Sequence, residues 1–120
     1  MKILLSSFDP SHIKIGIYQK LIGQASAFYN LGYEVFLMFI DSDGLKLRAF
    51  SSNKIIYSKK ISFNYMSLIE LYNSARKAVL IAKPDILYQR SSFHEPFFLA
   101  YLRFLKNSRV RIFYEVPTFP

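Results

Sequence analysis

The sequence contains no cysteine and no tryptophan. Without cysteine the chain can form neither disulfides nor thiolate metal sites, which suits a reducing compartment. Its longest uninterrupted apolar run, VFLMFI at residues 35–40, is far shorter than the roughly 20 residues that span a bilayer. The opening stretch MKILLSSFDP also lacks the long apolar core of a signal peptide. These shortages predict a cytoplasmic chain that is soluble, or at most peripheral at the inner face of a membrane.

Acidic residues are scarce: the sequence has eight Asp and Glu and sixteen Lys and Arg, which gives a net charge of +8. Such a balance favours anionic partners, among them phosphorylated substrates and acidic membrane surfaces. The basic residues are scattered, and their only adjacent pairs are Lys59-Lys60 and Arg76-Lys77. No run of them resembles a DNA-reading arm, so we do not expect nucleic acid as a partner.

Apolar residues make up 52% of the chain, enough for a packed core in one domain. Strand patterns occur at residues 2–6, 33–40, 85–89 and 110–115, and a hairpin is favoured within residues 41–63. Helical patterns occupy residues 17–31, 67–82 and 95–107, with Gly32 as a C-terminal cap of the first and Pro84 ending the second. The stripe expected to face the core from the second helix is Leu68, Ile69, Tyr72, Ala75, Val79 and Ala82.

This alternation of strands and helices predicts a Rossmann-like, three-layer α/β/α sandwich with a mainly parallel sheet. In such sheets, ligands bind beyond the carboxyl ends of the strands. The polar residues expected at those ends are Asp9, His12, Lys14, Gly16, Asp41, Asp43, Arg90, Ser91, Ser92, His94, Glu95, Glu115 and Thr118. They point to one cleft.

Each of these candidates has a plainer interpretation. Gly16 either opens a helical turn or lets a ligand phosphate approach the helix N-terminus. Arg90 either binds an anion or forms a salt bridge with Glu95 or Glu115. Asp41 and Asp43 flank Gly44 and are expected to be turn residues. No G-x-G-x-x-G, Ser-His-Asp, Walker or metal-ligand pattern stands out, so these residues alone predict only a ligand-binding α/β domain.

Several segments together resemble a known family. The chain resembles the N-terminal half of a GT-B glycosyltransferase, and more narrowly glycosyltransferase family 4. The segments that carry the resemblance are MKILLSS with its loop, GIYQKLIGQASAFYNLGYEVFLM, KPDILYQRSSF and YEVPTFP. The family pattern PD-[IV]-x-Y-x-R falls on residues 84–90 with Leu87 and Tyr88 inside it, and E-[IV]-P-T-[YF]-P falls on residues 115–120. One departure is Ile15, which precedes Gly16 where the family commonly carries a second glycine.

The resemblance implies a retaining, metal-independent transferase that moves a sugar from a nucleotide-sugar to a saccharide or lipid-linked acceptor in glycan biosynthesis. Residues 1–120 would form a single, incomplete acceptor-binding domain, without the C-terminal donor-binding domain. The acceptor side of the cleft would be lined by Arg90, His94, Glu115 and Thr118, and Gly16 would face the donor phosphates. The resemblance does not identify the catalytic residues. No cofactor or metal is expected. The alternative is a stand-alone, non-catalytic module for an anionic ligand.

Two further expectations follow from the same interpretation. The positive charge favours peripheral contact with anionic membranes, where lipid-linked acceptors reside. If the sheet follows the order 3-2-1-4-5, residues 110–115 form an edge strand, and the chain is expected to self-associate as a dimer.

Overall fold

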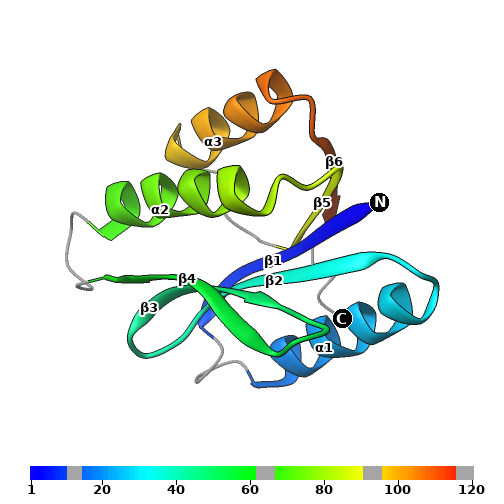
Figure 1. Ribbon diagram of the computed structural model, residues 1–120. Coiled ribbons are helices and arrows are strands. Elements are labelled where there is room, and N and C mark those ends of the chain that lie inside the picture. The colour runs from blue at the N-terminus through cyan, green and yellow to red at the C-terminus, as the bar shows by residue number, and fades with distance from the viewer. Residues whose placement is uncertain (11–14, 62–66, 91–95, 116–120) are drawn as a thin grey trace, which may run out of the picture.

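The computed structural model describes residues 1–10, 15–61, 67–90 and 96–115 (Figure 1). Its elements, in chain order, are β1 (Lys2–Pro10), α1 (Ile15–Asn30), β2 (Glu34–Ile40), β3 (Gly44–Ala49), β4 (Lys54–Lys60), α2 (Ser67–Ala82), β5 (Ile86–Arg90), α3 (Pro96–Asn107) and β6 (Arg111–Glu115). This is the predicted order of strands and helices, including the hairpin, and β1 runs further than residues 2–6.

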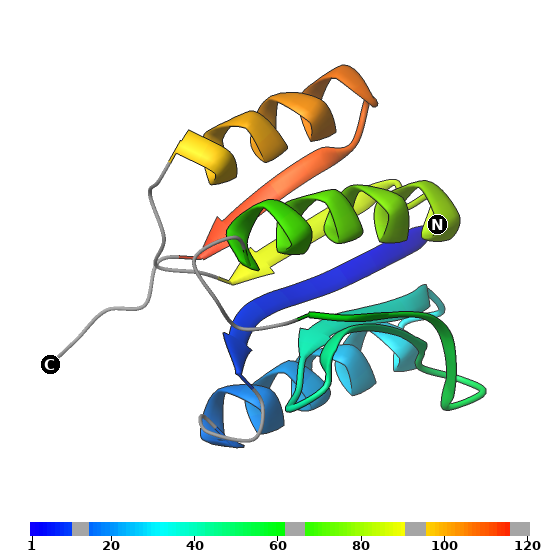
Figure 2. The same cartoon turned by 90° about the vertical axis from the view of Figure 1, so that its left-hand side faces the viewer.

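The described strands form one sheet in the order β4-β3-β2-β1-β5-β6. Strands β2, β1, β5 and β6 are mutually parallel, whereas β3 is antiparallel to both β2 and β4. Helix α1 covers one face of the sheet, and α2 and α3 cover the other (Figures 1 and 2). The fold is therefore the predicted three-layer α/β/α sandwich with a mainly parallel sheet.

Each face of the sheet has its own apolar core, because successive side chains on a strand point to opposite faces. Ile3, Leu5 and Leu37 pack with Leu21 and Ala25 of α1. The core under α2 and α3 takes the alternate strand residues and is larger; it includes Leu4, Met38, Leu47, Leu87, Tyr72, Val79, Phe98, Tyr101 and Leu105. Six consecutive residues of β2 are buried, as expected for a strand covered on both faces.

The end of α1 is fixed by a Schellman cap. Gly32 has a φ of 95°, and its N–H donates to the Tyr29 carbonyl at 3.0 Å. The N–H of Tyr33 donates to the Phe28 carbonyl at 3.2 Å, and the rings of these two residues meet edge to face at 5.8 Å. This apolar contact across the last turn usually accompanies the motif, so the predicted glycine cap is confirmed.

The buried face of α2 is partly different from the predicted one. Tyr72, Ala75, Val79 and Ala82 are buried as predicted, but Leu68 and Ile69 are 40% and 38% exposed. Leu71, Ser74 and Ala78 are buried in their place. Helix α2 packs against both the sheet and α3, and its small side chains permit the close approach of the two helices. The apolar pattern of α2 alone does not show that α3 buries part of its surface.

No helix in the described parts of the chain is both long and apolar enough to cross a membrane.

Candidate functional site

The sheet reverses its winding direction between β1 and β5. From β1 the chain passes through α1 to β2 on one side, and it later places β5 and then β6 on the other side of β1. The connecting helices consequently lie on opposite faces of the sheet (Figure 2), and open α/β sheets bind ligands beyond the carboxyl ends of their strands at such a point. This topological switch point is the candidate site.

A serine and a glutamine meet at this point on the face covered by α2 and α3. Ser6 of β1 lies opposite Gln89 of β5 in the parallel register, and both residues are fully buried. Ser6 Oγ and Gln89 Oε1 have no hydrogen-bond partner among the described residues. Gln89 Nε2 donates to the Arg90 carbonyl at 3.5 Å, which is a long hydrogen bond. Two buried oxygens without partners are costly unless a ligand or a water occupies the site.

The next pair along the two strands brings in an arginine. Ser7 lies opposite Arg90, and the alternation of both strands places them on the α1 face, in line with Ile86 and Tyr88. Arg90 is only 7% exposed, and its Nε has no hydrogen-bond partner among the described residues. A buried guanidinium with such a donor favours an anionic partner at the carboxyl end of β5.

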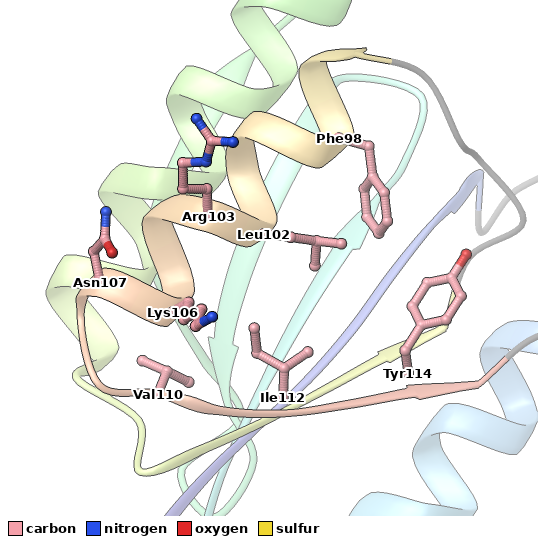
Figure 3. Close-up of a pocket in the computed structure, with 8 residues that line it drawn as sticks. All are labelled: Phe98, Leu102, Arg103, Lys106, Asn107, Val110, Ile112 and Tyr114. Carbon is pink, nitrogen blue, oxygen red and sulfur yellow. The ribbon is translucent and has the colours of Figure 1, made fainter.

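An apolar trough lies on the same face of the sheet, on the amino-terminal side of Arg90 along β5. It has a volume of about 240 Å³ and is lined by Ile3, Phe28, Tyr33, Ile86, Tyr88 and Phe113. A larger groove, of about 760 Å³, lies away from this point, between α3 and the outer edge of β6 (Figure 3).

The structure places some of the predicted site residues and does not describe others. Arg90 lies at the end of β5, as expected, and the backbone of Glu115 pairs with it in the parallel register. Gly16 lies in the first turn of α1 and is exposed. His94 and Thr118 lie outside the described residues, as do His12, Lys14, Ser91, Ser92 and Glu95 and the side chains of Asp9 and Glu115. A salt bridge between Arg90 and Glu95 or Glu115 is thus untested.

The acidic residues after β2 have a structural role, as predicted. Asp41 Oδ1 accepts hydrogen bonds from the N–H groups of Asp43 and Gly44, at 2.9 and 3.1 Å, and closes the turn. Asp41 Oδ2 accepts a hydrogen bond from Lys46 Nζ at 2.9 Å. Burial alone would raise the pKa of Asp41, but the hydrogen bonds from Lys46 and the two N–H groups outweigh it and lower that pKa. The same bond raises the pKa of Lys46.

Sequence reasoning did not single out Ser6, Ser7 or Gln89. The available signal is the sequence ILLSS, in which an apolar strand ends on two hydroxyl groups, but only the register with β5 shows that they are buried beside Arg90. Within the described ranges, no three His, Asp or Glu side chains gather as metal ligands would.

No protein-family model, curated protein or solved structure matches the chain. The chemistry of the switch point is therefore argued from its own residues: Arg90 on the α1 face of the sheet, and Ser6 and Gln89 on the face under α2 and α3.

Proposed function

We propose that this chain is the acceptor-side, N-terminal domain of a GT-B glycosyltransferase similar to family 4. The complete enzyme would transfer a sugar from a nucleotide-sugar, with retention and without a metal, to a saccharide or lipid-linked acceptor in glycan biosynthesis. Two features support this proposal. The sheet is doubly wound, as such a domain requires, and the segment that resembles the family motif PD-[IV]-x-Y-x-R forms β5 with its arginine at the carboxyl end.

The observation that carries the proposal is Arg90. Its guanidinium is 7% exposed, and its Nε has no hydrogen-bond partner among the residues that the structure describes; such a buried charge is costly unless an anionic group pairs with it. In the proposed enzyme, Arg90 binds the anionic or polar end of the acceptor. Glu115 and Thr118, from the end of β6, and His94, after β5, complete the acceptor side. Gly16 lies towards the donor.

A binding experiment on the 120-residue chain tests the role of Arg90. The amide signals of the chain are followed by NMR while inorganic pyrophosphate, farnesyl phosphate or a neutral disaccharide is added. We expect saturable shifts at Ser6, Ser7, Gln89 and Arg90 with at least one probe. Arg90→Met should abolish them, and Arg103→Met, which removes an exposed arginine from α3, should retain them. Binding that survives Arg90→Met removes this residue from the site.

A second candidate function is a non-catalytic module for an anionic ligand, favoured by the same arginine and by the net charge of +8. The reading frame after codon 120 separates the two. A frame that continues into a second α/β domain, whose product releases nucleoside diphosphate from a nucleotide-sugar, supports the transferase. A stop codon at that point supports the binding module. In either case we expect no sugar transfer by the 120-residue chain, because the donor-binding domain lies outside it.

A further inference from the structure

The two outer strands of the sheet differ in how open they are to another chain. Strand β4 carries Lys54, Lys59 and Lys60, and its register with β3 is irregular between Leu47 and Arg48. Repeated lysines and register irregularities are features that prevent edge-to-edge pairing. Strand β6 has neither: it pairs with β5 in an unbroken register, and no other described strand pairs with its outer edge.

The residue order of β6 is complementary to itself. Around Phe113 the strand reads Arg111, Ile112, Phe113, Tyr114, Glu115, with opposite charges at its two ends and apolar residues between them. In an antiparallel pair of two such strands centred on Phe113, each Arg111 lies opposite a Glu115 and each Ile112 opposite a Tyr114. Phe113 lies opposite its own copy. Opposite charges and aromatic residues stabilise directly opposed positions, so this register is favourable at every pair.

We propose that a second copy of this chain pairs with β6, antiparallel and about a two-fold axis at Phe113, to form a dimer with one continuous sheet. The two-fold arrangement uses the same patch on both copies, as isologous dimers do. Phe113 is 53% exposed, which is unusual for a phenylalanine on a strand, and the pairing would cover it with the partner's ring.

The groove beside α3 supports the same occupant. Its apolar lining consists of Phe98, Leu102, Val110, Ile112 and Tyr114, and its rim of Arg103, Lys106 and Asn107. Figure 3 shows the side chains of Phe98, Leu102, Ile112 and Tyr114 directed into the space between α3 and β6. Two-fold pairing of β6 places the groove of one copy beside that of the other, on the same face of the joined sheet. The apolar linings then cover each other.

Charge opposes the dimer at long range, since each copy carries +8. Salt screens this general repulsion, whereas directly opposed Arg111–Glu115 pairs in the proposed register would be screened less. The dimer is therefore expected to tighten as salt rises. An association held mainly by scattered surface charges would weaken instead.

Analytical ultracentrifugation of the 120-residue chain and of charge variants tests the proposal. The wild-type chain should show a concentration-dependent dimer. Arg111→Glu places like charges opposite each other at both ends of the pair, and so does Glu115→Arg, so each should weaken the dimer about tenfold. Lys20→Glu, on exposed α1, changes the net charge as Arg111→Glu does and should not weaken it.

The decisive measurement combines the two variants. Mixed together, the Arg111→Glu and Glu115→Arg chains should form a heterodimer at least as tight as the wild-type dimer, and the double variant should recover wild-type affinity. Circular dichroism confirms that each variant is folded. A wild-type chain that stays monomeric at high concentration overturns the proposal. So does a double variant as weak as the two single ones, or a mixture that gains no affinity.

Discussion

Two buried polar side chains show how differently unpaired groups are tolerated. The Tyr101 hydroxyl is fully buried under α2 and α3 and has no hydrogen-bond partner among the described residues. Burial raises the pKa of Tyr101, so the group stays neutral, and its ring packs against those of Phe8, Tyr72 and Phe98. Arg90 stays charged at 7% exposure, and its Nε has no hydrogen-bond partner among the described residues. Its burial costs more and indicates a ligand more strongly.

Replacing Arg90 with methionine should therefore leave the melting temperature unchanged or raise it, while ligand binding is lost. Methionine keeps an apolar stem of similar length and removes the buried charge, an exchange that is often neutral or stabilising. Thermal unfolding monitored by circular dichroism measures the effect. Tyr101→Phe is the matched control, since it removes an unpaired hydroxyl from the other face of the sheet and should raise stability with binding intact. A fall of several degrees in Arg90→Met would instead assign the arginine to a structural salt bridge.

At the scale of elements, the ends of the helices are set by backbone geometry as much as by the apolar pattern. Helix α3 ends in a cap like that of α1, with the N–H of Val110 donating to the Leu105 carbonyl and that of Arg109 to the Lys106 carbonyl, both at 3.2 Å. Arg109 takes the left-handed position with a φ of 60°. An L-residue there is strained by roughly 1–2 kcal/mol, and glycine is not.

Arg109→Gly should consequently stabilise the protein, by up to about 1 kcal/mol once the greater freedom of glycine in the unfolded chain is subtracted. Chemical denaturation gives the free energy of unfolding. Arg109→Ala is the control: it removes the same exposed charge but keeps the strain, so it should give no gain. If alanine stabilises as much as glycine does, the effect belongs to the charge and not to the backbone.

The turn between β2 and β3 should make stability depend on pH. Because the folded protein lowers the pKa of Asp41 from its usual 3.8, the carboxylate contributes stability above that value, and the contribution is lost as the pH falls through the folded pKa. The pKa of Lys46 is raised from 10.5, so its contribution is lost only as the pH rises through that higher value.

Urea denaturation over a range of pH tests this, with Asp41→Asn as the comparison. The amide keeps an oxygen that can accept the N–H bonds of the turn but loses the charge that binds Lys46. Wild type should be the more stable at neutral pH, and the difference should shrink as the pH falls below about 4. Parallel pH curves for the two proteins would contradict this role of Asp41.

Sequence patterns predicted the elements and their order because each leaves a local mark. Gly32, Pro84 and the alternation within β6 all act within a few residues. The buried face of α2 was partly wrong because Leu68 and Ile69 carry the right residue types, while Ala78 and Ser74 are buried only where α2 meets α3 and the sheet. Arg90 could be identified from its place at a strand end. Its neighbours Ser6 and Gln89 could not, since they are far apart in sequence and meet only through the register of β1 and β5.

For the whole molecule, the dominant electrostatic feature is the excess of sixteen cationic over eight anionic side chains. Several cationic residues lie on exposed surface near the α3–β6 edge, among them Arg103, Lys106, Arg109 and Arg111. Near an anionic membrane each such residue contributes about 1 kcal/mol of attraction.

The chain should sediment with vesicles that contain phosphatidylserine and not with vesicles of phosphatidylcholine alone. The attraction should disappear at about 1 M salt, where the Debye length falls to roughly 3 Å. Sedimentation that is indifferent to salt would rule out electrostatic binding. A double variant with Arg103 and Lys106 changed to Gln tests whether the α3–β6 edge contacts the vesicles. It should sediment with them less than a control variant in which Lys54 and Lys59 on β4 are changed to Gln.

The position of β1 at the centre of the sheet has a consequence for how the protein is made. During synthesis, β1 can pair with β2 as soon as residues 34–40 leave the ribosome, but its other edge must wait for residues 86–90. At ordinary translation speeds that interval lasts on the order of seconds. Throughout it, Leu4, Phe36 and Met38 have neither α2 nor α3 over them. During this interval the exposed apolar surface makes the nascent chain prone to aggregation and offers a binding surface for chaperones. Ser6 and Gln89 meet only when β5 closes this gap, so the candidate site forms in the same late step that shields the core.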